Sequence, residues 1–360
     1  MAGENPEKIK VLIAEDSRFM SRMITDILNA DPAIEVVGIA RDGTEVLKKV
    51  AELNPDCITL DLEMPRMDGL ETLRYLMCEW PTPVVILSAC GEKEAVRALT
   101  CLEYGAVDFV AKSSSGINFH AEELICKIKI AARVNVSKMR FAPPHYRFDT
   151  RRGSVNSESM EAVVVIGAST GGPNVLMEII PDLPPDLPAG FIVIQHMPGE
   201  FTRYLAERLN ERSEIEVVEA KNGDRIEPGR VLVAPGGGHL IYEKRGKMPS
   251  VTILPRNNSQ RTACPSIDFA LTSLSPVFRG RMIAAILTGM GKDGLSGCNV
   301  LSSFGGRIIV QNPESCIVSG IPGSIINDDL ADSVVEPEEI AALIGEEIQR
   351  IEAGGKVYGS

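Results

Sequence analysis

Residues 161–180, EAVVVIGASTGGPNVLMEII, contain a buried strand, a tight turn and the start of a helix. The run 162–166 is apolar throughout, which is typical of a strand covered on both faces of a sheet. The turn GASTGG follows, and Pro173 suits the first turn of a helix. This strand–turn–helix context fits G-x-S-x-G, a pattern that exposes a nucleophilic serine, here Ser169.

Two other interpretations of this turn need to be weighed. A glycine-rich phosphate loop is one, but neither G-x-G-x-x-G nor G-x-x-x-x-G-K-[ST] occurs at these positions. The other is structural: the glycines make a tight turn and Ser169 caps the helix. The motif alone does not decide between a nucleophile and a cap.

The rest of residues 161–360 repeats the strand–helix alternation with longer loops. Together these patterns predict an α/β domain with a doubly wound, mainly parallel sheet. Strands are expected at 162–167, 191–195, 231–234, 282–288 and 307–310, and a hairpin at 239–243 and 251–254. Helices are expected at 173–180, 200–211, 266–278, 294–304 and 337–351.

A serine hydroxyl needs an adjacent base to become a good nucleophile. The chain has four histidines: His120, His145, His196 and His239. His196 follows the buried run FIVIQ, so it ends a strand as Ser169 does. Position therefore favours His196 as the base, with His239 as the second choice.

A base of this kind needs a carboxylate to orient it. Asp293 lies in the glycine-rich turn of MIAAILTGMGKDGLSG (282–297), after a third strand, whereas no strong strand leads to its rival Asp224. Backbone N–H groups around Met290 and Gly291 would suit an oxyanion. The three strands are thus expected to bring Ser169, His196 and Asp293 to one edge of one sheet.

The N-terminal part, residues 1–132, contains five strand–helix repeats. Polar side chains end four of its strands: Glu15 and Asp16, Asp61, Ser88, and Lys112. Carboxylates crowded together need a cation, so this cluster predicts a Mg²⁺ site with oxygen ligands. Asp61 would then act as a nucleophile toward a phosphoryl donor. Helix capping by Asp16 or Ser17 is the plain structural alternative.

Composition limits the class of protein. The 360 residues have a net charge of −12, which divides as −8 in 1–132, +4 in 133–160 and −8 in 161–360. The Pro-, Ser- and Arg-rich segment 133–160 is interpreted as a linker between two acidic domains. The acidic balance argues against nucleic acid as a partner. Eight cysteines without a C-x-x-C pair, no apolar signal at the N-terminus and no long apolar run predict a cytoplasmic protein without membrane insertion.

Residues 8–132 resemble response-regulator receiver domains. The matching segments are EDS (15–17), DLEMPRMDGLE (61–71), LSA (87–89) and Lys112. The resemblance implies that Asp61 is phosphorylated, that Glu15 and Asp16 hold Mg²⁺, and that Glu63 offers its backbone carbonyl. It also implies that Ser88, Phe109 and Lys112 form the switch. Ser113 stands where these domains usually have proline, which affects the expected turn and not the lysine.

The C-terminal part resembles the chemotaxis protein-glutamate methylesterase family, CheB. Its matching segments are GASTGGP, QHMP (195–198), APGGGHL (234–240) and LTGMGKDG (287–294). The resemblance implies that Ser169 is the nucleophile, His196 the base and Asp293 its orienter, with Met290 and Thr170 beside the oxyanion. It implies that His239 is not the catalytic histidine, and that the esterase chemistry needs no cofactor.

The expected architecture is therefore a (βα)5 receiver domain (1–132), a linker (133–160) and a methylesterase domain (161–360). The expected activity is phosphorylation-activated hydrolysis of glutamate methyl esters on chemoreceptors, with deamidation of receptor glutamines. The resemblance implies a chemotaxis histidine kinase as phosphodonor and a receiver domain that covers the active site when unphosphorylated. Two rivals are a response regulator with a degenerate, binding-only esterase domain and a transcriptional regulator.

Overall fold

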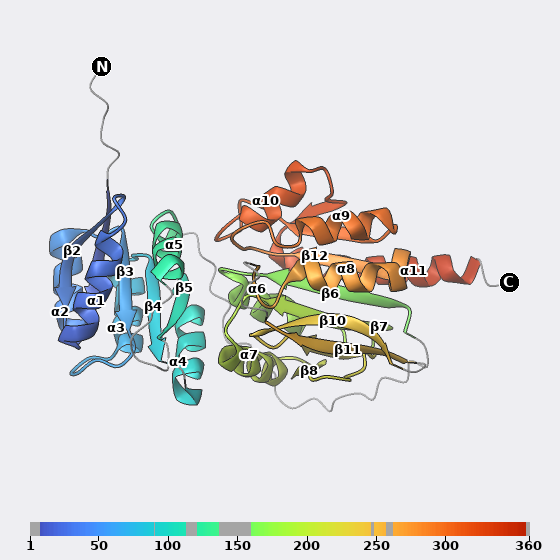
Figure 1. Ribbon diagram of the computed structural model, residues 1–360, viewed down its shortest axis with the longest axis horizontal. Helices are drawn as coiled ribbons and strands as arrows, with labels where there is room; N and C mark the ends of the chain where they lie inside the picture. Colours follow the sequence, from blue (N-terminus) through green and yellow to red (C-terminus); the bar gives the residue numbers. More distant parts are fainter. Residues whose placement is uncertain are drawn as a thin grey trace, which may run out of the picture. The chain divides into compact units, whose positions relative to one another are not determined.

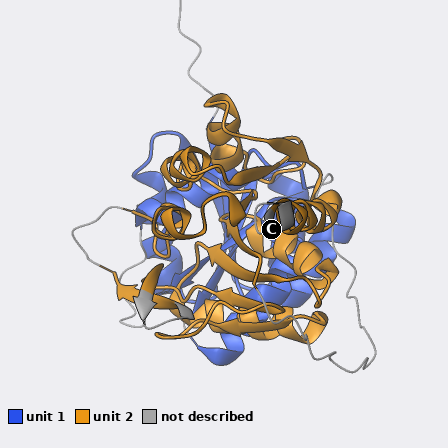
Figure 2. Ribbon diagram, turned by 90° about the vertical axis from the view of Figure 1, so that its right-hand side faces the viewer, with its two compact units in different colours: residues 1–141 blue, residues 142–360 orange. Residues whose placement is uncertain are grey.

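The computed structural model describes residues 8–89, 91–112, 121–136, 160–245, 248–256 and 262–357. The chain forms two compact units, Met1–Phe141 and Ala142–Ser360 (Figure 2). The division falls inside the segment 133–160 that was interpreted as a linker, of which 137–159 lie outside the described residues. The exact domain boundaries therefore stay a prediction.

The first unit is built on a parallel sheet in the order β2-β1-β3-β4-β5 (Figure 1). Its strands are β1 (Ile9–Ala14), β2 (Ile34–Ala40), β3 (Cys57–Asp61), β4 (Val84–Ala89) and β5 (Asp108–Lys112). Its helices are α1 (Arg18–Asn29), α2 (Gly43–Leu53), α3 (Gly69–Glu79), α4 (Glu92–Glu103) and α5 (Ala121–Ala131). Helix α1 contacts α5, while α2, α3 and α4 contact one another in series. The five expected repeats are confirmed.

Side-chain caps fix where three of these helices begin. Ser17, Asp42 and Asp68 accept hydrogen bonds from the backbone N–H of Met20, Glu45 and Glu71 respectively. Such caps satisfy donors that a helix N-terminus leaves without an intrahelical partner. Helices α1 and α2 therefore start within a few residues of β1 and β2, whereas a longer loop separates β3 from α3.

The second unit has a seven-stranded, wholly parallel sheet in the order β14-β13-β12-β6-β7-β9-β8. Its strands are β6 (Ala162–Ala168), β7 (Ala189–Gln195), β8 (Glu216–Glu219), β9 (Arg230–Val233), β12 (Met282–Ile286), β13 (Arg307–Gln311) and β14 (Ser333–Val335). An antiparallel hairpin, β10 (Gly238–Arg245) and β11 (Met248–Pro255), lies outside this sheet. The predicted doubly wound sheet and the hairpin are confirmed.

Helices cover both faces of this sheet (Figure 1). They are α6 (Gly172–Ile179), α7 (Gly199–Arg212), α8 (Ile267–Phe278), α9 (Leu295–Ser303), α10 (Gly320–Asn327) and α11 (Pro337–Val357). One apolar cluster joins alternate strand residues such as Val163, Ile192 and Ala284 to α8, α9, α10 and the hairpin. Helices α6 and α11 contact each other, and α11 contacts β6, β12 and β13. Strands buried on both faces explain the continuous apolar runs in the sequence.

Three elements were missed at the sequence level. Strands β8 and β14 lie at the two edges of the sheet and are only four and three residues long. Short, polar edge strands give little periodicity to read. Helix α10 has the sequence GIPGSIIN, whose two glycines and one proline disfavour a helix from local propensity.

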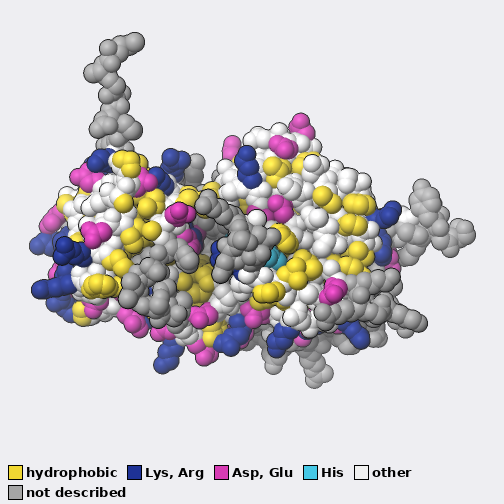
Figure 3. Space-filling view, viewed as in Figure 1, with side chains coloured by type: hydrophobic (Ala, Val, Ile, Leu, Met, Phe, Trp, Pro, Cys, Tyr) yellow, Lys and Arg dark blue, Asp and Glu magenta, His cyan; other side chains and the backbone are white. Residues whose placement is uncertain are grey.

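On the face drawn in Figure 3, basic and acidic side chains both appear on the described surface of each unit. The expectation that nucleic acid is not the partner stays a prediction. In the part of the chain that the structure describes, no helix is both long enough and apolar enough to span a membrane.

The loop between β9 and β10 lies against the loop after β7. A Cβ atom on Gly236 would meet the backbone of Met197, Pro198 and Gly199. Because those contacts are main chain, they cannot move aside as a flexible side chain would. We expect Gly236→Ala to destabilise the second unit by about 1–3 kcal/mol, as overpacking does.

The measurement is the free energy of unfolding of the second unit from urea denaturation. The matched control is Gly323→Ala in α10, where a Cβ would meet nothing within 4 Å. That change should be neutral or stabilising, because alanine is favoured over glycine within a helix. Equal stability of the two variants would contradict the proposed close approach.

Candidate functional site

Ser169 and His196 directly follow two paired strands. In the register of β6 and β7, Ala168 is opposite Gln195, and the His196 amide donates to the Ala168 carbonyl at 3.1 Å. The strand on the other side of β6 is β12, and the Ser169 amide donates to the Thr288 carbonyl just beyond that strand at 3.0 Å. The strand order reverses around β6, which is where doubly wound sheets form their sites.

His196 is bonded to Asp293. Its Nε2 lies 2.7 Å from Asp293 Oδ2, and the two side chains are about 15% exposed. The carboxylate also accepts hydrogen bonds from Ser266 Oγ at 2.7 Å and from the Ile267 amide at 2.7 Å, at the start of α8. The positive end of the helix dipole and these donors favour the charged carboxylate.

These contacts set the ionisation of Asp293. Burial alone would raise its pKa, but the hydrogen bonds from His196, Ile267 and Ser266 and the charge of His196 outweigh burial and hold the pKa below its ordinary value. Asp293 is therefore ionised at neutral pH and can only accept, so His196 Nε2 carries the hydrogen. Nδ1 is the ring nitrogen left to take a proton.

Asp268 holds the turn that carries Asp293. Its carboxylate accepts from the amides of Gly294 at 2.9 Å and Gly297 at 2.6 Å, at the start of α9. The Asp268 amide in turn donates to Asp293 Oδ1 at 3.2 Å. Asp293 thus caps the start of α8, which contains Asp268. Asp268 in turn caps the start of α9, which follows the turn that carries Asp293. Asp268 was not among the predicted site residues, although its place in the first turn of an expected helix is a capping signal.

The turn after β12 is fixed by a buried polar network. The Thr288 hydroxyl donates to the Thr170 carbonyl at 3.0 Å and accepts from the Val318 amide at 3.0 Å. The Thr288 amide donates to Gln311 Oε1 at 2.8 Å. A Cβ on Gly289 would lie 2.7 Å from that of Ser169, so this position requires glycine. Thr288 and Gln311 were also missed, because single buried polar residues in apolar runs carry no periodic signal.

The structure brings four of the predicted esterase residues together. Ser169, Thr170, His196 and Asp293 lie around one end of the sheet, and Met290 is partly exposed in the turn after β12. Among the described residues no hydrogen bond joins the Ser169 hydroxyl to His196; such bonds are often long in enzymes without substrate.

The two rivals of these residues have other surroundings. His239 is buried and stacks on Phe269, with ring centroids 4.3 Å apart, and burial lowers its pKa. Asp224 accepts from the Lys221 amide at 2.8 Å and thereby caps its own turn. Among the described residues, Asp293 and not Asp224 is hydrogen-bonded to His196, so the geometry favours Asp293 as the partner of that histidine.

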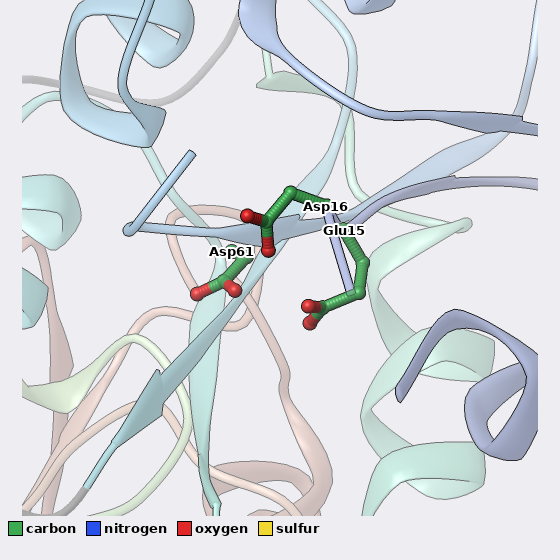
Figure 4. Close-up of side chains that lie close together, drawn as sticks. All are labelled: Glu15, Asp16 and Asp61. Carbon is green, nitrogen blue, oxygen red and sulfur yellow. The ribbon is translucent and has the colours of Figure 1, made fainter. Parts of the chain in front are cut away.

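A second cluster lies in the first unit, where the carboxylates of Glu15, Asp16 and Asp61 converge beyond β1 and β3 (Figure 4). One oxygen from each lies within 4.8 Å of the others. Ser17 caps α1, so the capping alternative applies to Ser17 and not to Asp16. Three convergent carboxylates fit a hard cation such as Mg²⁺, which takes oxygen ligands.

Lys112 partly neutralises this cluster. Its Nζ lies 2.6 Å from Asp61 Oδ2 and 3.0 Å from Glu15 Oε2. Burial raises the pKa of Glu15 to about 7; Lys112 opposes the rise and the charge of Asp61 adds to it. When ionised, the three carboxylates carry more charge than the one lysine that contacts them, which supports the fit of a divalent cation.

The remaining predicted residues lie around this cluster. Ser88 is buried and its hydroxyl donates to the Ala89 and Glu94 carbonyls at 3.2 Å each. Phe109 is buried, with Lys127 Nζ 5.4 Å from its ring centroid. The Glu63 amide donates to Asp61 Oδ1 at 3.3 Å. The expected contact of the Glu63 carbonyl with a metal stays a prediction.

Comparison with known proteins gives matches to both units. A family model described as CheB methylesterase matches residues 164–344, and one described as response regulator receiver domain matches residues 11–124. A protein-glutamate methylesterase/protein-glutamine glutaminase of Symbiobacterium thermophilum is 42% identical, over 93% of this chain and 96% of that protein. One of Thermotoga maritima is 39% identical, over 93% and 98%.

Solved structures match the units separately. The crystal structure of the Thermotoga maritima CheB methylesterase catalytic domain is 40% identical, with a TM-score of 0.49, and covers 51% of this chain and 97% of that one. The response regulator domain of Thermotoga maritima CheB is also 40% identical, with a TM-score of 0.34, and covers 36% of this chain and 99% of that one.

The lowered pKa of Asp293 predicts a pH dependence of stability. The ordinary value is 3.8 and the folded value is lower, so the folded state binds fewer protons at this group. The stability that Asp293 provides is present above the ordinary value and is lost as the pH falls through the folded value. The difference in unfolding free energy between wild type and Asp293→Asn should therefore shrink below about pH 4.

Urea denaturation at a series of pH values measures this difference. Asp328→Asn, at an exposed position in the same unit, is the matched control and should show a small, flat difference. A difference for Asp293→Asn that stays constant down to the lowest pH would contradict the assigned hydrogen bonds.

Proposed function

The chain belongs to the CheB methylesterase family, so it is a protein-glutamate methylesterase/protein-glutamine glutaminase with a receiver domain, and we propose that Ser169, His196 and Asp293 perform its chemistry. One observation carries the assignment of residues. The His196–Asp293 bond of 2.7 Å lies beside the strand end that bears Ser169. This observation supports the nucleophile–base–orienter arrangement of serine hydrolases, with Ser169, His196 and Asp293 in those roles.

The proposed reaction begins with the Ser169 hydroxyl oxygen attacking the carbonyl carbon of a glutamate methyl ester. His196 Nδ1 takes the hydroxyl proton, while Asp293 accepts from Nε2 and stabilises the charged imidazole. When the tetrahedral intermediate collapses, the same proton passes to the leaving methoxide, which departs as methanol. Water then attacks the glutamyl ester of Ser169, and His196 moves its proton to the serine oxygen. With glutamine as substrate, ammonia leaves instead of methanol.

The negative oxygen of the intermediate needs donors. We assign this role to backbone N–H groups at Thr170 and at the turn of Met290, as expected from the sequence. Thr288 lies just after β12, two residues before Met290. Its hydroxyl holds this turn against the Thr170 segment by donating to the Thr170 carbonyl, and it also accepts from the Val318 amide. A donor held in place before the reaction costs no reorganisation when charge develops.

The receiver domain implies a kinase as phosphodonor, and the methylesterase domain implies methylated receptors as substrates. We propose that Asp61 attacks the phosphoryl group from a chemotaxis histidine kinase. Glu15, Asp16 and Asp61 would hold Mg²⁺, which neutralises charge on the phosphoryl oxygens when bound. Lys112 would pair with the phosphorylated Asp61, and Ser88 and Phe109 would respond to it. No disulfide joins any two of the seven described cysteines, which supports a cytoplasmic setting.

The triad assignment is tested with Ser169→Ala. We expect methanol release from methylated receptor membranes to fall by at least about 10³-fold, because the nucleophile is removed. The thermal midpoint should stay near that of wild type. Ser303→Ala, at an exposed position on α9, should leave methanol release unchanged. Undiminished release by Ser169→Ala would exclude Ser169 as the nucleophile.

Control by phosphorylation is tested with Asp61→Asn. A phosphoryl analogue with Mg²⁺ should raise methanol release by wild type and by Asp26→Asn, an exposed acid on α1 that serves as the control. Asp61→Asn should show no such rise, since an amide does not accept the phosphoryl group. Equal stimulation of Asp61→Asn and wild type would refute Asp61 as the site.

A further inference from the structure

Gln195 ends β7, between the strand and the proposed base. Its side chain is 1% exposed. Nε2 donates to the Ser169 carbonyl at 2.9 Å and to the His196 carbonyl at 3.2 Å. One amide group therefore links the main chains of the proposed nucleophile and the proposed base, which belong to two different strand ends.

The surroundings of the amide are tight. Gln195 Oε1 is buried and has no hydrogen-bond partner among the described residues. It lies against Gly172, where a Cβ would collide with it. A buried carbonyl without a partner is unfavourable for folding and offsets part of the stabilisation from the two hydrogen bonds that Nε2 donates, so stability alone is a weak reason for a glutamine here. Residues that break a folding rule in this way are concentrated at functional sites.

We propose that Gln195 is a positioning residue of the esterase reaction. It fixes the distance between the main chains of Ser169 and His196, and it orients the peptide group between Ser169 and Thr170. This inference rests on the proposed roles of Ser169 and His196. Gln195 does not touch the reacting atoms, and it acts through the groups that do.

The geometry of the peptide group between Ser169 and Thr170 explains how Gln195 orients it. The Ser169 carbonyl and the Thr170 N–H belong to one planar peptide group and point in opposite directions. That carbonyl accepts from Gln195 Nε2 and from the Gly172 amide at 2.8 Å. Two donors fix the plane of the group, and they polarise it so that its N–H is a stronger donor. Gln195 thereby prepares the N–H that the proposed mechanism directs at the oxyanion.

Gln195→Met tests the proposal in the full-length chain. Methionine has a similar length and flexibility but has no donor. We expect kcat for methanol release to fall about 10- to 100-fold with KM unchanged, because a small displacement of reacting groups has this effect. The rate at which a fluorophosphonate labels the serine should fall by a similar factor. The pH midpoint of labelling should not move, since the His196–Asp293 bond is kept.

Two variants separate positioning from general destabilisation. Ser275→Ala removes a buried hydroxyl of α8 that bonds Leu271 and Met282, and it should lower the thermal midpoint while leaving labelling unchanged. Gln195→Glu keeps the shape but places a carboxyl oxygen against two carbonyl oxygens. It should label at least as slowly as Gln195→Met, and it carries the test if the methionine variant does not fold.

The outcomes test the role of Gln195 separately from the role of Ser169. Slower labelling with unchanged KM and unchanged pH midpoint supports the positioning role. Labelling no slower than in Ser275→Ala, or a shifted pH midpoint, overturns it. If Ser169→Ala is labelled as fast as wild type, the proposed nucleophile itself is wrong, irrespective of Gln195.

Discussion

The proposed esterase site depends on one largely buried carboxylate, Asp293. It accepts hydrogen bonds from His196, Ser266 and the amides of Ile267 and Asp268. Burying this charge would be costly without those donors. The start of α8 therefore supports the charge, and the charge in turn fixes the ring of the proposed base. Asp268 closes the arrangement from the other side, because it holds the turn that carries Asp293 through the amides of Gly294 and Gly297. The same hydrogen bonds therefore cap the two helices and hold the carboxylate that orients the proposed base.

In the described part of the receiver domain, by contrast, the carboxylates have too few cationic partners to balance their charge. These carboxylates converge, and among the described residues Lys112 is the cation that pairs with them, while burial raises the pKa of Glu15 to about 7. The cluster is thus unbalanced in charge by construction. A site with excess negative charge fits a divalent cation, and such a cation together with Lys112 would favour the phosphoryl group that we propose for Asp61.

The strongest sequence signals were local and periodic, and these predicted the sheets well. The buried runs before Ser169, His196 and Asp61 match β6, β7 and β3, and their polar ends lie at one edge of each sheet. The short edge strands β8 and β14 and the glycine-containing α10 gave weak signals because their stability comes from tertiary contacts. The supporting residues Gln195, Thr288, Gln311 and Asp268 were missed for a related reason. Their partners lie on other strands and turns, so only the folded chain shows what they bond.

In the second unit, the reacting groups and the residues that form the apolar core lie at different places along the strands. The reacting groups follow the strands, whereas the strand interiors, such as Val163, Val165 and Ile192, are buried in an apolar core. Exchanges among aliphatic residues of similar volume in those interiors tune stability without altering the reacting groups. The start of α8 offers no such freedom. Heat resistance can therefore be selected in the strands of this enzyme, while the few residues around Ser266 and Asp293 change stability and activity together.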